Sequence, residues 1–245
     1  MRQWLSPSRN DVISLISENL QQVQARIIEA CLKANRQPND VNLLAVSKTK
    51  PIEDVAKALE AGQRHFGENY LQDAIPKVQA LPHAYWHFIG HIQSNKTRDI
   101  AAHFDFVHGV ASEKVATRLN AHRPENKAPL GVFIQINLVS ETSKGGLAPE
   151  ALPALVDHIR TLSRLEFLGL MALPPQSFGQ IARSAFFTNV RLLLEQLPPH
   201  PEISQANQLS MGMSDDLETA IASGATWVRI GTAIFGDRNK NGETL

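Results

Sequence analysis

The sequence predicts an α/β fold: a single (β/α)8 TIM barrel with a leading N-terminal helix, occupying residues 1–245 as one domain. Short apolar segments alternate with amphipathic segments about eight times, which is typical of parallel strands joined by right-handed crossovers. The chain has 245 residues, a length that α/β barrels often use as one domain. No Gly/Ser linker or low-complexity tract divides it. A doubly wound open sheet is the structural alternative.

The leading helix is predicted over about residues 10–35, because apolar residues recur there at three- and four-residue spacing. The strands are predicted in the short apolar segments, which are, in order, "NLLAVSKT" (42–49), "RHFGEN" (64–69), "YWHFIG" (85–90), "FDFVHGV" (104–110), "LGVFIQINL" (130–138), "LEFLGLMAL" (165–173), "QLSMGM" (208–213) and "TWVRIG" (226–231). The helices are predicted between and after them, at 51–62, 69–80, 95–103, 112–122, 147–162, 184–197, 214–224 and 232–236.

The composition limits the classes of partner. Lys and Arg total 24 and Asp and Glu total 24, so zero net charge gives no electrostatic case for nucleic acid or an anionic membrane. The single cysteine, Cys31, cannot form an internal disulfide and is expected to be a small core residue of the leading helix. The first residues lack the apolar core of a signal peptide, and no apolar run is long enough to span a membrane. A cytoplasmic protein is expected.

Polar and glycine-rich segments follow the predicted strands, where barrels place their active sites. The segment "LLAVSKTKP" contains two lysines. Alternation puts Leu44, Val46 and Lys48 on one face of the strand, with Lys48 at its last position, but parity does not decide which face points inward. Lys50 lies beyond the strand, directly before Pro51, and is expected to be a solvated loop lysine. For Lys48 the alternative is a surface lysine at the start of a loop.

A lysine at a barrel mouth can attack an aldehyde as a free amine, and pyridoxal 5′-phosphate (PLP) is the common aldehyde cofactor. The phosphate sites of such barrels often lie after strands seven and eight. There the sequence reads "SMGMS" and "GTAIFG", in which glycines would let backbone N–H groups approach an anion and hydroxyls would add donors. The candidates are Ser210, Gly212, Ser214, Gly231 and Thr232. Ser214 could instead be a helix cap.

Arg229 precedes Gly231 by two residues on the last predicted strand. A guanidinium only donates hydrogen bonds, so facing a pyridine nitrogen it would keep that nitrogen unprotonated and weaken PLP as an electron sink. The alternative is a barrel-wall arginine paired with an acid.

Long segments of the chain resemble the YggS/PROSC family of PLP homeostasis proteins. The resemblance runs from about residue 10 to 238, through "LLAVSKTKP", "HFGENYLQDA", "WHFIGHIQSNK", "IQINLVSETSKGG", "GLMAL" and "LSMGMSDDLETAIASGATWVRIGTAIFG". It implies one barrel similar to the N-terminal domain of alanine racemase, with PLP held as a Schiff base on Lys48. It further implies phosphate loops in "SMGMS", which includes Met211, and in "RIGT", with Arg229 near the pyridine nitrogen. Asn69, His87 and Met171 match positions around the cofactor ring.

The sequence therefore predicts a PLP-binding carrier or regulator in intracellular vitamin B6 homeostasis, with no catalytic residue assigned. The alternative is a PLP-dependent amino-acid racemase, which needs a second base opposite the lysine; the two tyrosines, Tyr70 and Tyr85, are expected to be packing residues. A metal site is not expected, because His87 and His91 straddle a strand end. The expected partners are PLP and PLP-requiring apo-enzymes, with no nucleic acid or membrane, and the expected state is a monomer.

Overall fold

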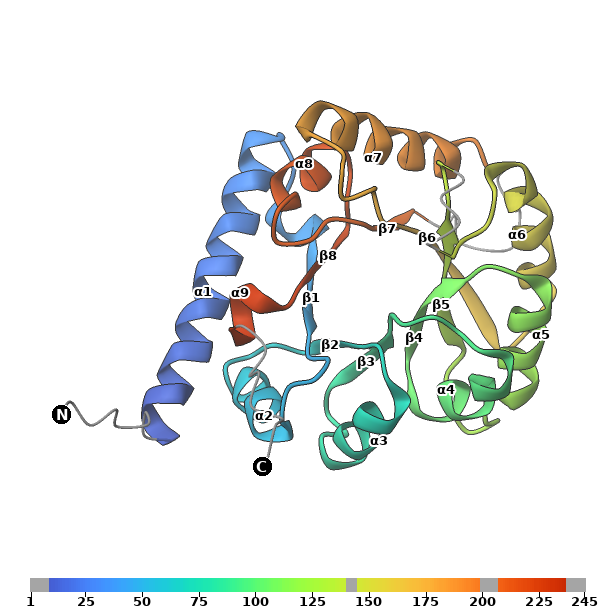
Figure 1. Cartoon of the computed structure of the whole chain (residues 1–245). Helices are drawn as coiled ribbons and strands as arrows, with labels where there is room; N and C mark the ends of the chain where they lie inside the picture. Colours follow the sequence, from blue (N-terminus) through green and yellow to red (C-terminus); the bar gives the residue numbers. More distant parts are fainter. Residues whose placement is uncertain (1–8, 140–144, 199–206, 237–245) are drawn as a thin grey trace.

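The strands form a closed barrel. The structure, a computed structural model, describes residues 9–139, 145–198 and 207–236, with side chains from residue 15 onward. Within these ranges, parallel strands pair in sequence order and the last pairs with the first (Figure 1). They are β1 (Asn42–Val46), β2 (His65–Glu68), β3 (Tyr85–Phe88), β4 (Phe106–Val110), β5 (Leu130–Ile136), β6 (Leu165–Ala172), β7 (Gln208–Ser210) and β8 (Trp227–Ile230). The predicted barrel is confirmed, and the open-sheet alternative is excluded.

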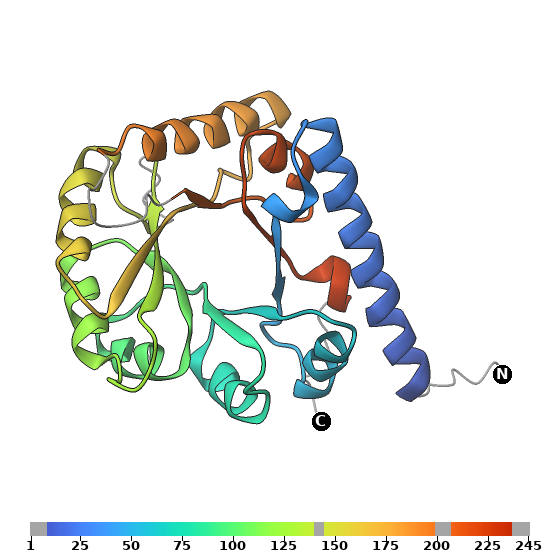
Figure 2. The same ribbon diagram turned by 180° about the vertical axis from the view of Figure 1, so that it is seen from behind.

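The helices form an outer ring, which the view from behind also shows (Figure 2). They are α1 (Arg9–Lys33), α2 (Ile52–Glu60), α3 (Leu71–Ala80), α4 (Thr97–His103), α5 (Glu113–His122), α6 (Leu152–Arg160), α7 (Gln180–Glu195), α8 (Leu217–Ala222) and α9 (Thr232–Phe235). Short 3-10 turns lie at Pro38–Asp40, Ser94–Lys96 and Pro149–Ala151. Local sequence explains several ends: Ser112 Oγ accepts the Val115 N–H at the start of α5, and Gly62 takes a φ of 98° after α2.

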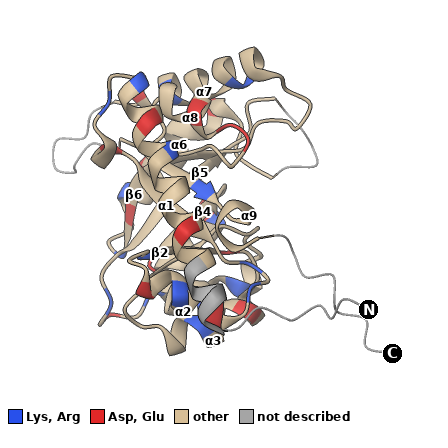
Figure 3. Cartoon of the chain, turned by 90° about the vertical axis from the view of Figure 1, so that its left-hand side faces the viewer, with Lys and Arg blue, Asp and Glu red and all other residues tan. Residues whose placement is uncertain are grey.

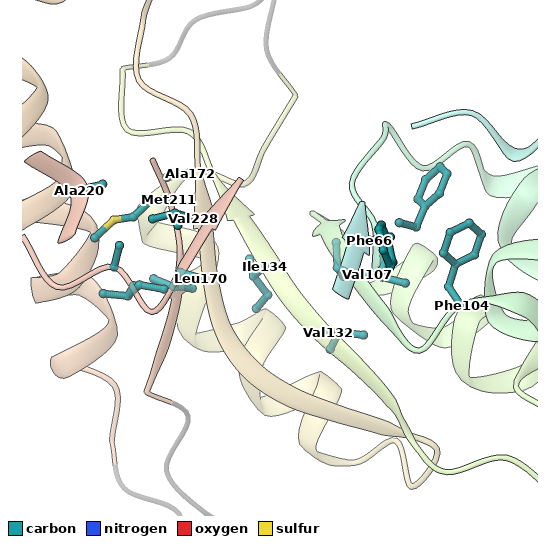
Figure 4. Close-up of a cluster of buried hydrophobic side chains, with 14 of the residues drawn as sticks. Phe66, Phe104, Val107, Val132, Ile134, Leu170, Ala172, Met211, Ala220 and Val228 are labelled. Atoms are coloured by element: carbon teal, nitrogen blue, oxygen red, sulfur yellow. The ribbon is translucent and has the colours of Figure 1, made fainter. Parts of the chain in front are cut away.

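Two apolar layers hold the barrel together. The outer layer packs strand residues that face outward against the helices, as Figure 4 shows for Phe66, Val107, Ile134, Leu170 and Val228. The inner layer fills the barrel with Leu44, Phe133, Leu168, Met171 and Trp227. The strands are thus apolar on both faces, as expected of a parallel sheet covered on both sides.

Helix α1 completes the ring between α2 and α8, and it also contacts α9 (Figure 1). Ile16, Leu20, Val23 and Ile27 form its buried stripe, and Cys31 at the end of this stripe is fully buried, as predicted. None of the described helices, α1 included, is long and apolar enough to cross a bilayer. Acidic and basic residues are interspersed over the face of the molecule seen in Figure 3.

Candidate functional site

A cavity of about 790 Å³ opens where the carboxyl ends of the strands meet, a volume suited to a small ligand. Four of its polar lining residues come from opposite ends of the chain: Lys48 follows β1, Arg229 lies on β8, and Ser214 and Thr232 follow β7 and β8. The other residues that line it are Val46, Asn69, Ile89, Met171, Leu173, Pro174, Gln176, Met213, Asp215, Gly231 and Ala233. The strand order of the barrel therefore makes neighbours of groups that are about 180 residues apart.

Lys48 lies in a turn just past β1, not at the last strand position as predicted. β1 ends at Val46, and the turn is closed by the Lys50 N–H, which donates to the Ser47 carbonyl at 3.1 Å. Leu44 belongs to the interior layer, so the face shared by Leu44, Val46 and Lys48 is the inward one. The alternation of side chains continues past the end of the strand, so Val46 and Lys48 both line the cavity.

A buried ion pair supports the backbone directly before Lys48. Lys77 Nζ on α3 lies 2.8 Å from Glu68 Oε1 on β2 and donates to the Ser47 carbonyl at 2.9 Å. The Ser47 hydroxyl donates to the same carboxylate oxygen at 2.7 Å. Burial raises the pKa of Glu68, and the Lys77 ammonium and the Ser47 hydroxyl oppose that rise. Glu68 Oε2 is buried and makes no hydrogen bond among the described residues. The pair fixes Ser47 by both its hydroxyl and its carbonyl.

Lys50 is not a solvated loop lysine, so that prediction is wrong. Its ammonium donates to the carbonyls of Phe235 and Gly236 at 3.0 and 2.9 Å. These carbonyls end α9, where a helix leaves its last acceptors unbonded and where a cation is favoured. Lys50 therefore attaches the turn after β1 to the helix after β8.

Arg229 reaches the cavity from the barrel wall and is almost fully buried. Its Nη1 donates to the carbonyl and the hydroxyl of Ser210, at 2.5 and 2.8 Å, and its Nη2 donates to the Ala172 carbonyl at 3.0 Å. Burial lowers the pKa of Arg229 to about 10, with nearby Asp216 opposing the change, so the side chain remains a cation at pH 7. The hydrogen bonds described for the Arg229 guanidinium are with Ser210 and Ala172, and no acid among the described residues pairs with it in a salt bridge.

The segment after β7 forms a turn before α8 begins at Leu217. Ser214 is therefore not the cap of α8, and it lines the cavity instead. Asp216 turns back to accept the Met213 N–H at 2.6 Å, so its negative charge is engaged within the turn. Helix α1 holds this turn from outside, because Arg26 donates to the Ser214 carbonyl at 3.0 Å.

The segment after β8 supplies backbone donors at the cavity. The Ile234 N–H makes the first bond within α9, to the Gly231 carbonyl at 2.9 Å. The N–H groups of Thr232 and Ala233 precede that bond, as the first N–H groups of any helix do. Asn19 of α1 donates to the Ile234 carbonyl at 2.9 Å, so α1 contacts both loops.

Four of the residues predicted for the site lie behind the cavity rather than in its lining. Ser210 supports Arg229, and His87 is fully buried inside the barrel. Met211 packs in the outer apolar layer near Ala220 (Figure 4). Gly212 accepts the Arg229 N–H through its carbonyl at 3.0 Å. The other seven, Lys48, Asn69, Met171, Ser214, Arg229, Gly231 and Thr232, line the cavity.

Gly212 allows the loop after β7 to lie directly on α8. Its φ is 94°, and a Cβ there would stand 2.5 Å from Ala220 Cβ. We expect Gly212→Ala to lower the free energy of unfolding by about 2–4 kcal/mol, combining left-handed strain with overpacking. The matched control is Gly62→Ala, which has a φ of 98° but nothing within 4 Å of the added carbon. It should lose only about 1–2 kcal/mol in the same urea titration, from strain alone. Equal losses would mean that the contact with Ala220 is unimportant.

The sequence identified most of the residues that line the cavity but not the buried polar residues behind it. Glu68 and Lys77 carry a signal that could have found them, because each places a charge on an otherwise apolar strand or helix face. His65 and His108 lie on inward-facing strand positions, like His87, and each places a polar ring on a largely apolar face, which is a similar signal. Groups of three or more His, Cys, Asp or Glu that could hold a metal ion do not occur in the described ranges.

Comparison with known proteins decides the family. Residues 16–239 match the family described as alanine racemase, N-terminal domain. A protein of Pseudomonas aeruginosa named pyridoxal phosphate homeostasis protein is 52% identical over 229 residues, covering 93% of this chain and 97% of the relative. The chain belongs to the pyridoxal phosphate homeostasis family. An Escherichia coli member of the same name is 44% identical over 230 residues, 91% of this chain and 97% of the relative.

Solved structures agree with this family assignment. PipY of Synechococcus elongatus without PLP is 36% identical, with a TM-score of 0.80 over 90% of this chain and 100% of that one. PipY with PLP bound is 35% identical, with a TM-score of 0.77 and the same coverage. Alanine racemase of E. faecalis is 17% identical, with a TM-score of 0.68 over 95% of this chain and 60% of that one, so it shares the fold.

Proposed function

We propose that this protein binds PLP as a Schiff base on Lys48 and acts as a carrier or regulator in PLP homeostasis. The observation that carries the proposal is the meeting of a lysine amine, a buried arginine and two hydroxyl-bearing loops in one cavity at the barrel mouth. The names of the relatives and the PLP-bound PipY structure support the choice of cofactor.

The donors in the cavity fit PLP in type. We assign the phosphate to the Ser214 and Thr232 hydroxyls and to the backbone N–H groups of Thr232 and Ala233. α9 is a single turn and has no long helix dipole, so its first backbone N–H groups would bind the phosphate by direct hydrogen bonds. Arg229 would donate to the ring nitrogen, which would keep that nitrogen unprotonated.

The remaining lining suits the ring and its substituents. The side-chain oxygen of Asn69 is buried and has no hydrogen-bond partner among the described residues, so it is open to a donor on the ligand. Ile89, Met171 and Leu173 supply apolar surface for the ring faces. Bound PLP supplies a reactive aldehyde carbon and a conjugated ring that withdraws electrons.

A carrier role without turnover fits the lining better than a racemase. Tyr70 and Tyr85 are both outside the cavity lining and about half exposed, so neither stands opposite Lys48. An arginine at the ring nitrogen would further weaken electron withdrawal by the ring. We also propose a cytoplasmic, monomeric, single-domain protein over residues 1–245 that passes PLP to PLP-requiring apo-enzymes.

The lysine assignment is tested by trapping. We expect purified protein mixed with PLP to develop the visible absorption of a Schiff base, and borohydride to attach the cofactor to Lys48, as read by peptide mass spectrometry. Lys48→Ala should lose both signals, whereas Lys114→Ala, which removes an exposed lysine on α5, should keep both. Trapping that persists in Lys48→Ala would overturn the assignment. Rapid racemisation across a panel of amino acids by the wild-type protein would overturn the carrier role.

A further inference from the structure

A line of polar side chains, fully buried except for the partly exposed His65, crosses the barrel interior beneath the cavity. We call it the histidine chain: His65 on β2, His87 on β3, His108 on β4 and Ser210 on β7. His65 Nδ1 lies 3.0 Å from His87 Nε2, His87 Nδ1 lies 2.9 Å from His108 Nε2, and His108 Nδ1 lies 2.8 Å from Ser210 Oγ. Ser210 Oγ is in turn bonded by Arg229. The chain thus runs from β2 to Ser210, which contacts Arg229 of the cavity lining.

The surroundings of the chain are apolar. His87 stacks on Phe106 and His108 stacks on Phe133, each with ring centroids 4.3 Å apart. His65 stacks on Tyr85 and meets the edge of Trp227. Arg229 is the charged group in described contact with this line, through Ser210. Polar groups in such a place are costly unless every donor finds an acceptor, so the hydrogen-bond order can be worked out.

The order begins at Arg229, which can only donate. Ser210 Oγ accepts from it, and because Ser210 is fully buried, its own proton needs an acceptor, which His108 Nδ1 provides. His108 is then protonated on Nε2 and donates to His87 Nδ1. His87 is likewise protonated on Nε2 and donates to His65 Nδ1. All three imidazoles are neutral in this order.

The opposite order is disfavoured on two grounds. It would leave the buried Ser210 proton without its acceptor, and it would point three successive N–H dipoles toward the guanidinium. In an interior of low dielectric, the cation of Arg229 instead turns the positive end of each dipole away from itself. Burial also lowers the pKa of all three histidines. The neighbouring histidines lower the pKa of His87 further, and Arg229 lowers the pKa of His108 further, so the imidazoles stay neutral.

We propose that the histidine chain is a positioning relay with one fixed tautomeric order, and that through Ser210 it holds the Arg229 guanidinium toward the ring nitrogen of bound PLP. Ser210 and His108 are positioning residues in this proposal, and they need not touch the cofactor. The role at the ring rests on the proposed function, whereas the tautomeric order does not.

The order is tested first without PLP. Nitrogen NMR of imidazole-labelled protein at pH 7 should show His65, His87 and His108 as neutral Nε2–H tautomers, assigned by single substitutions. A Nδ1–H tautomer or a charged ring at His87 or His108 would overturn the relay. This measurement gives a result even if the protein does not bind PLP.

The role at the cofactor is tested with the PLP-loaded protein. His108→Leu removes both bonds, whereas the His108→Gln amide can accept from Ser210 and donate to His87. We expect roughly tenfold weaker PLP binding in His108→Leu, the effect of losing one hydrogen bond to a charged group. The pH midpoint of its visible band should also fall, because a displaced Arg229 lets the ring nitrogen take a proton and so makes the linkage less basic.

The Gln variant and the wild type separate the possible outcomes. A PLP affinity and a pH midpoint of the visible band close to those of the wild type in His108→Gln would support a hydrogen-bonding role for His108. A wild-type midpoint in a folded His108→Leu would overturn the relay while leaving the proposed function intact. Failure of the wild-type protein to bind PLP would overturn the proposed function and, with it, the role at the ring, and the NMR result would still decide the order.

Discussion

Lys77→Met is expected to lower the free energy of unfolding by about 3–5 kcal/mol at pH 7, the cost of leaving a buried charge without its partner. Glu68 is fully buried and Lys77 is 5% exposed, so water cannot replace the lost ammonium. The same change removes the donor to the Ser47 carbonyl, and so it should also disturb the turn that carries Lys48. Urea unfolding gives the stability, and PLP trapping gives the effect on the turn.

Two further measurements separate charge from packing. In Lys77→Met the loss should shrink as the pH is lowered, because burial raises the pKa of Glu68 and its protonation removes the unpaired charge. The double variant Glu68→Gln/Lys77→Met should recover part of the stability. The control Lys33→Met breaks an ion pair between exposed side chains of α1 and should change little. A loss in Lys77→Met no greater than in Lys33→Met would contradict the buried pair.

The second large effect is acid destabilisation by the interior histidines. Burial lowers the pKa of His65 to about 4, and it lowers the pKa of His87 and His108 well below the usual value. The folded state therefore binds fewer protons than the unfolded chain, in which histidine titrates near 6.5. The stabilising effect is complete above about pH 6.5 and is lost as the pH falls toward the folded pKa values. Glu68 acts in the opposite direction, since burial raises its pKa.

The contribution of His65 can be isolated by His65→Gln. Between pH 6.5 and 4, the stability difference between wild type and variant should change by about 1 kcal/mol per pH unit. This is below the ~1.4 kcal/mol per unit of a fully buried group, because His65 is partly exposed. Urea titrations at each pH provide the measurement, with the exposed His83→Gln as matched control. A pH dependence identical to wild type would show that His65 is not held neutral.

The barrel was predictable because its signals are local and repeated. Each strand is a short apolar run, and each helix has its own apolar stripe. Eight repeats of this strand–helix unit are compatible with few sheet topologies. The cavity followed from the same order, since the ends of parallel strands meet at one mouth. Lys48, Arg229 and Thr232 could therefore be grouped from the sequence alone, although their individual contacts with PLP stay predictions.

The contacts that hold the cavity residues in place were not predictable, because they depend on the register of the strands and on partners that are distant in the sequence. Lys50 bonds carbonyls 185 and 186 residues away, and its own neighbourhood in the sequence gives no hint of them. The inward face of β1 could not be chosen by parity, since both faces of the strand are apolar. The three histidines lie on neighbouring strands but not opposite one another, since His65 is in register with Tyr85 and His87 with Phe106, and only the pairing of β2, β3 and β4 brings their rings into contact.

The cavity draws its functional groups from the first strand and from the last. During synthesis, Lys48 leaves the ribosome long before Arg229 and Thr232, and β1 stays an open edge until β8 pairs with it. A nascent chain that stops before β8 has Lys48 but lacks Arg229 and Thr232, two of the residues proposed to hold PLP. If PLP binds as proposed, its capture therefore requires β8, because this strand both closes the barrel against β1 and brings Arg229 to the cavity.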